Sequence, residues 1–135
     1  MSIFRRAFSR SDSPDRLLRD LHRTPLLHRG EINRCVPDQQ GVYVFYTPDN
    51  QVAYVGQARE QTLRVRVRNQ FSGGTATSPC TLIKNYMTRT GQAFDEAREV
   101  ISNYRVRCFA VEDARRRRLL ESLATGRLQP LYVGN

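Results

Sequence analysis

Two short apolar runs joined by a turn constrain the fold of this chain most strongly. Residues 41–46 read GVYVFY, residues 51–56 read QVAYVG, and the four residues between them, TPDN, are typical of a turn. β-Branched and aromatic residues fill both faces of the first run, which indicates a strand buried on both sides. The pattern therefore predicts an antiparallel hairpin whose first strand is buried.

The loop at residues 47–50 sets the expected register of this hairpin. With that loop, Tyr46 faces Gln51, and Tyr43 faces Tyr54. Directly opposed residues share a face, with Cβ atoms about 4.5–5.5 Å apart. We therefore expect two tyrosines side by side on one face, with Gly41 opposite Gly56 leaving space at the same end.

Capping residues and hydrophobic periodicity predict several further elements. Ser13 and Pro14 start a short helix that Pro25 ends, and Ser78-Pro79 starts another that Gly91 stops. Residues 92–102 form a further helix, and residues 104–111 alternate as a third strand. Asp113 caps a last helix that runs to about residue 125, where Gly126 terminates it, with a core stripe of Arg116 (its aliphatic stem), Leu119, Leu120 and Leu123.

Residues 62–71 (TLRVRVRNQF) fit two structures equally well. Apolar residues alternate with arginines, as in a strand, yet Leu63, Val67 and Phe71 also form a helical stripe. Thr62 is a suitable N-cap and Gly73-Gly74 a suitable stop. Periodicity alone leaves strand and helix open here.

Charge gives the first indication of a partner. Lys and Arg total 22 against 13 Asp and Glu, a formal net charge of +9, and all 22 except Lys84 are arginines. Arginine forks match phosphate in two-point contacts, so a nucleic-acid partner is expected. The 135 residues suit one domain, and an Arg-rich but otherwise ordinary protein is the alternative.

Several classes of site find no support in the sequence. The three cysteines and two histidines form neither a CxxC pair nor HExxH, and the GxGxxG and GxxxxGK[ST] nucleotide motifs are missing. No apolar stretch is long enough to span a membrane, and the first residues lack the apolar core of a secretory signal. We expect a cytoplasmic protein with free thiols.

Five motifs in order resemble the GIY-YIG nuclease family. They are Gly41-Val42-Tyr43, Tyr54-Val55-Gly56, the segment 63–67, residues 118–121 and the closing Pro130, Tyr132 and Asn135. The likeness covers residues 36–135. It implies a small α/β (α+β) domain, a three-stranded antiparallel sheet flanked by helices, and it implies that residues 62–71 are helical. Residues 1–35 are then a basic extension with a short helix.

The resemblance implies an endonuclease that hydrolyses DNA phosphodiester bonds with one Mg²⁺ or Mn²⁺ ion. Glu121 is then the metal ligand and Arg66 stabilises the phosphate. Tyr43 positions or activates the attacking water, and a base role requires positive charge nearby because a free tyrosine has a pKa near 10. Tyr54 hydrogen-bonds near the phosphate, and Asn135 gives polar support.

Contacts to nucleic acid are expected from the side chains around this set, namely Gln57, Arg59, Arg64, Arg68 and Gln70. Gln57 stands where many members of the family carry Lys, and Gln70 where many carry His or Tyr. Val133 and Gly134 separate Tyr132 from Asn135, which departs from the family pattern. The remaining Arg115–Arg118 run is expected to be solvated or to face phosphate.

Two other functions compete with the nuclease. One is a catalytically silent module that holds nucleic acid on the same fold, and the other is a basic RNA-associated protein with chance similarity. The second lacks the aromatic pattern used for base stacking. Dimerisation through an amphipathic helix within residues 13–28 is a further hypothesis.

Overall fold

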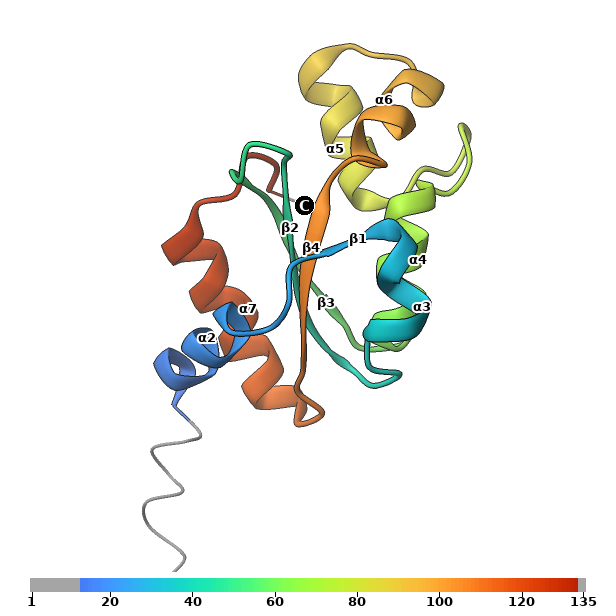
Figure 1. The fold of residues 1–135 in the computed structure, drawn as a ribbon. Coiled ribbons are helices and arrows are strands. Elements are labelled where there is room, and N and C mark those ends of the chain that lie inside the picture. The colour runs from blue at the N-terminus through green and yellow to red at the C-terminus, as the bar shows by residue number, and fades with distance from the viewer. Residues whose placement is uncertain (1–12, 134–135) are drawn as a thin grey trace, which may run out of the picture.

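The fold is built on a four-stranded antiparallel sheet with the spatial order β1-β4-β2-β3. The computed structural model describes residues 13–133. The strands are β1 (Leu27–His28), β2 (Gly41–Tyr46), β3 (Val52–Ala58) and β4 (Arg105–Ala110). The three strands predicted from the sequence are present, and the two-residue β1 adds a fourth at one edge. At the other edge lies β3, so part of its backbone faces outward (Figure 1).

Helices cover both faces of the sheet (Figure 1). On one face α2 (Pro14–His22) packs against α7 (Ala114–Leu128), and on the other lie α3 (Ile32–Cys35), preceded by the 3₁₀ turn η1 (Arg29–Glu31), and α4 (Leu63–Ser72). Helices α5 (Thr81–Thr90) and α6 (Phe94–Ile101) continue that second layer beyond one end of the sheet. The result is a mixed α/β architecture. No helix within residues 13–133 is long and apolar enough to cross a membrane.

The central strand β2 separates two hydrophobic cores. Tyr43 and Phe45 face the α4 side, whereas Val42, Val44 and Tyr46 face the α7 side. All six residues of β2 are buried, because helices cover both faces of this strand. This double burial explains why its sequence is continuously apolar instead of alternating.

The register of the β2–β3 hairpin differs from the prediction. Thr47 pairs with Gln51, Asn50 takes a left-handed conformation with φ of 67°, and the register shifts again between Phe45 and Tyr46. A three-residue turn followed by an irregularity replaces the expected four-residue loop. The partner of Tyr43 is therefore Gly56, and Tyr54 lies diagonal to Tyr43, still on the same face.

The ambiguous segment is a helix. The Thr62 side chain accepts a hydrogen bond from the Val65 amide, and Gly73 ends the helix in a left-handed conformation. The stripe Leu63, Val67 and Phe71 is buried against the sheet. In a helix these three apolar side chains all pack against one hydrophobic surface, so the helical pattern, not the strand-like alternation, matches the structure.

The last helix, α7, is longer and differently rotated than the sequence predicts. It continues through Gly126 to Leu128 and ends at Gln129, which has φ of 49°, so Gly126 is an interior residue. Its buried stripe is Arg117, Leu120 and Ala124, whereas Leu119 is 42% exposed. The prediction placed Arg116 and Leu119 in the core. The helix is turned because backbone carbonyls receive the guanidinium of Arg117 and thereby permit its burial.

The N-terminal segment takes part in the fold from residue 13 on. Ser13 caps α2 as predicted, and Leu17, Leu18 and Leu21 are buried in the core shared with α7. The apolar face of this helix is thus covered within the chain. Residues 1–12, with much of the basic extension, lie outside the described part of the structure.

Candidate active site

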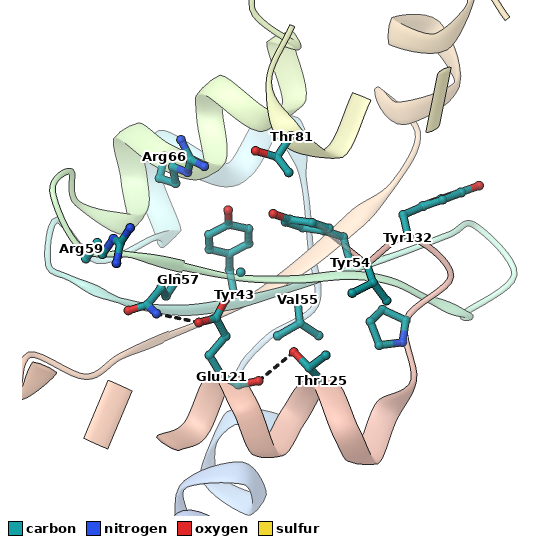
Figure 2. A pocket seen from close by; sticks show the side chains of 13 residues that line it. Tyr43, Tyr54, Val55, Gln57, Arg59, Arg66, Thr81, Glu121, Thr125 and Tyr132 are labelled. Carbon is teal, nitrogen blue, oxygen red and sulfur yellow. Dashed lines mark hydrogen bonds between the residues drawn. The ribbon is translucent and has the colours of Figure 1, made fainter. Parts of the chain in front are cut away.

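Most of the predicted catalytic residues meet in a pocket at the open edge of β3. The pocket has a volume of about 400 Å³. Figure 2 shows α4-side groups above the strand and α7-side groups below it. An edge strand has no further strand to separate the two faces of the sheet, so side chains from both faces reach a common space there. The lining residues are Tyr43, Tyr54, Val55, Gly56, Gln57, Arg59, Arg66, Thr81, Glu121, Thr125, Pro130, Tyr132 and Val133.

Tyr43 lies directly over Gly56. A Cβ atom at residue 56 would come within 2.5 Å of the Tyr43 hydroxyl oxygen, so only glycine leaves the ring its place. The Tyr43 ring also packs edge-on against Phe45, with centroids 5.7 Å apart, and lies 6.2 Å from the ring of Tyr54. Gly56 of β3 thus leaves the space that the Tyr43 ring of β2 occupies.

A buried glutamine holds the Tyr43 hydroxyl from behind. Gln70 is fully buried, its Nε2 donates to Tyr43 Oη at 3.0 Å, and its Oε1 accepts from the backbone amide of Leu82 at 3.1 Å. The amide of Leu82 belongs to the first turn of α5, where the N-cap Cys80 supplies no side-chain cap. Because that amide can only donate, the orientation of the glutamine is fixed, and Nε2 must face the tyrosine.

The Tyr43 hydroxyl is therefore a proton donor toward the pocket. It accepts a hydrogen bond from Gln70 Nε2, and the guanidinium of Arg66 acts on it electrostatically. A phenol has one proton and two acceptor positions, so its own proton remains for a group in the pocket. Burial, reinforced by Tyr54, raises the pKa of Tyr43 well above its ordinary value, and the opposing effect of Arg66 is smaller. The positive charge expected to lower this pKa is present, but desolvation outweighs it.

Tyr54 completes the tyrosine side of the pocket. It lines the pocket together with Thr81, the first residue of α5. Burial raises its pKa, against the lowering effects of Thr81 and Arg66. Both tyrosines are therefore neutral near pH 7 and can donate hydrogen bonds to an anionic group.

Glu121 supplies the carboxylate on the opposite side. Its Oε1 accepts from Gln57 Nε2 at 2.6 Å, and Figure 2 shows this bond beneath the strand. Gln57 Oε1 in turn accepts from Arg117 Nε at 3.1 Å. The guanidinium of Arg117 also donates to the carbonyls of Val111 and Glu112. Gln57 thus joins the buried arginine to the carboxylate.

The donor set of the pocket fits one hard divalent cation. Within residues 13–133 no group of three or more His, Cys, Asp or Glu side chains is placed to hold a metal. A single carboxylate suffices for Mg²⁺, which retains several waters and takes further oxygens from a phosphate. Only Oε1 of Glu121 is engaged by Gln57, which leaves Oε2 for such an ion.

Several predicted contact residues lie elsewhere. Arg64 donates to the carbonyl of Val36, and Arg68 donates to Asn33, so both point from α4 toward the α3 side. Gln70 is buried, which is incompatible with the direct nucleic-acid contact expected of it. Gln57 and Arg59 do line the pocket. Asn135 lies outside the described residues.

Two contributors were not predicted from the sequence. Thr81 lines the pocket because α5 begins there. Ser78-Pro79 indicated that a helix starts nearby, but not that its first residue faces the pocket. Arg117 belongs to the run expected to be solvated or to face phosphate, yet it is only 5% exposed. A run of four arginines gives no sign of which one is turned inward.

Comparisons with known proteins leave the family open. No protein-family model matches the chain, and a search of curated proteins finds no significant match.

Proposed function

We propose that this protein is a metal-dependent endonuclease that hydrolyses DNA phosphodiester bonds in the pocket at the β3 edge, as the resemblance to the GIY-YIG nucleases implies. One observation carries the proposal. Tyr43, Tyr54, Arg66 and Glu121 come from four separate elements, and all four line the same pocket. Residues brought together from such distant parts of the chain indicate a site, because packing alone requires no such set of polar groups.

The side chains on the two sides of the pocket have different roles in the proposed phosphodiester hydrolysis. Arg66 provides a positive charge for the phosphate, and the protons of Tyr43 and Tyr54 are placed to hold its oxygens or the attacking water. The raised pKa of Tyr43 favours positioning over proton abstraction by this residue. Arg59 lies at the rim, where it can contact the backbone of the nucleic acid.

Glu121 is the residue that would hold Mg²⁺ or Mn²⁺. A bound ion of this kind supplies Lewis-acid stabilisation of the leaving oxygen. The net charge of +9 provides the long-range attraction for DNA that this function needs.

Cleavage of plasmid and single-stranded DNA with Mg²⁺, with Mn²⁺ and with EDTA tests the proposal, using wild type and Glu121→Ala. We expect metal-dependent cutting that the substitution abolishes. If neither substrate is cut but salt-sensitive binding remains, the protein is a silent nucleic-acid-binding module. Equal cutting by the variant would mean that Glu121 is not the ligand.

A further inference from the structure

Arg117 is a buried cation whose hydrogen-bond acceptors within residues 13–133 are all neutral. It is 5% exposed, and its guanidinium donates to Gln57 Oε1 at 3.1 Å and to the carbonyls of Val111 and Glu112 at 3.2 and 3.0 Å. Burying a charge is costly, so a position that retains one without a carboxylate partner calls for an explanation. The three acceptors explain how the charge is tolerated, but not what it does.

A partner of opposite charge stands one helical turn away. Arg117 and Glu121 are four residues apart on α7, a spacing at which side chains commonly form an ion pair. Instead, the amide of Gln57 lies between them and bonds to both, at 3.1 Å to the guanidinium and at 2.6 Å to the carboxylate. Gln57 comes from β3, so the sheet supplies the group that separates two charges of the same helix.

The orientation of the amide follows from Arg117. A guanidinium has only donors, so it requires the oxygen of Gln57 on its side, and the NH₂ group must then face Glu121. The reverse orientation would place an amide oxygen against a carboxylate oxygen and an NH₂ group against the guanidinium. A direct ion pair would instead occupy the carboxylate and neutralise it.

We propose that Arg117 and Gln57 form a positioning relay for Glu121, in which Arg117 fixes the amide of Gln57 and Gln57 holds one carboxylate oxygen, so that the other carboxylate oxygen is available to a divalent cation. Both residues act through Glu121, and the relay presupposes the metal site of the proposed function. Partners that orient a metal ligand in this way are usually worth about 10–100-fold in metal affinity.

The affinity of the 135-residue chain for Mn²⁺, measured by titration without nucleic acid, tests the relay. Arg117→Met removes the cation, and Arg115→Met, at an exposed position of the same helix, removes the same charge outside the relay. Loss of a positive charge alone should leave cation binding unchanged or make it tighter. The relay predicts the opposite for Arg117→Met, about 10–100-fold weaker binding, with Arg115→Met near wild type.

If Arg117→Met does not fold, Gln57→Met provides a second test. This substitution changes no charge, and Gln57 is only partly buried. We expect a similar loss of affinity, with a double variant no weaker than either single one, since the two residues act as a unit. Glu121→Gln is the reference. If it loses Mn²⁺ while folded Arg117→Met and Gln57→Met bind like wild type, the relay is wrong and the metal site stands. If wild type shows no Glu121-dependent binding, the metal site itself fails, and the relay with it.

Discussion

On each side of the pocket a glutamine amide orients one candidate functional group, but one glutamine is buried and the other is partly exposed. On each side a glutamine amide is fixed by a group that can only donate, and its NH₂ end holds the functional oxygen. Behind Tyr43 the fixing group is the backbone amide of Leu82, and behind Glu121 it is the side chain of Arg117. Gln70 is fully buried, whereas Gln57 is partly exposed and lines the pocket.

In the proposed nuclease, this difference gives the two sides of the pocket different tasks. The dry side keeps a phenol neutral and directs its proton, since burial raises the pKa of Tyr43. The open side presents a carboxylate that water and ions can reach. A hydroxyl that must remain protonated benefits from burial, and a ligand for a hydrated cation benefits from access to solvent.

The largest expected effect distinguishes the pocket face of α4 from its other face. Arg66→Met should lower the rate of DNA cleavage about 10²–10³-fold, because it removes a donor aimed at developing charge. Arg64→Met removes the same charge two residues earlier, where the side chain bonds to the carbonyl of Val36. We expect it to lower the rate far less. Steady-state cleavage assays at equal salt compare the two, and equal losses would mean that only the net charge matters.

The next effect concerns the buried amide. Gln70→Leu leaves the hydroxyl of Tyr43 and the amide of Leu82 without their partner, which should lower the free energy of unfolding by about 1–3 kcal/mol. Gln57→Leu, at the partly exposed counterpart, should cost less stability. Urea denaturation measures both. Similar losses would contradict the contrast between a dry and an open side.

A pair of glycines tests the seat of Tyr43. Gly56→Ala introduces a methyl group against the Tyr43 hydroxyl and should cost about 1–3 kcal/mol of stability, together with cleavage activity. Gly126→Ala, inside α7 where the added Cβ meets no atom within 4 Å beyond its own stretch of helix backbone, should stabilise the protein by about 0.5–1 kcal/mol. Thermal unfolding measures both signs, and a stabilised Gly56→Ala would mean that the ring has room to move.

The smallest effect is a dependence on alkaline pH. The pKa of Tyr43 is raised in the folded protein, so above about pH 10 the unfolded chain loses this proton first and stability falls as pH rises. Each such proton changes the free energy of unfolding by at most about 1.4 kcal/mol per pH unit. Tyr43→Phe should therefore show a shallower loss of stability between pH 9 and 11, measured by urea denaturation. An unchanged slope would mean that Tyr43 ionises as readily folded as unfolded.

Many of the helices and strands and most of the candidate site could be predicted from the sequence. Strand β2 was predictable because its apolar run is long enough to be buried on two faces, and Tyr43 and Tyr54 share a face because side chains alternate along strands. The resemblance selected Arg66 and Glu121 among many similar charges. The helix caps at Ser13, Thr62 and Asp113 were predictable because short polar side chains accept hydrogen bonds from backbone amides of the first helical turn.

The hairpin register and the environments of Arg117 and Gln70 depend on neighbouring groups that only the packed chain provides. The left-handed Asn50 and the register shift moved Gly56 opposite Tyr43, a change of two residues that keeps every side chain on its face and so leaves the apolar pattern unaltered. The inward turn of Arg117 depends on carbonyls that only the folded chain brings near it. The burial of Gln70, and with it the direction of the Tyr43 proton, depends on where α5 begins. Composition and periodicity report which faces are apolar, but contacts between distant polar groups arise only when those faces have packed.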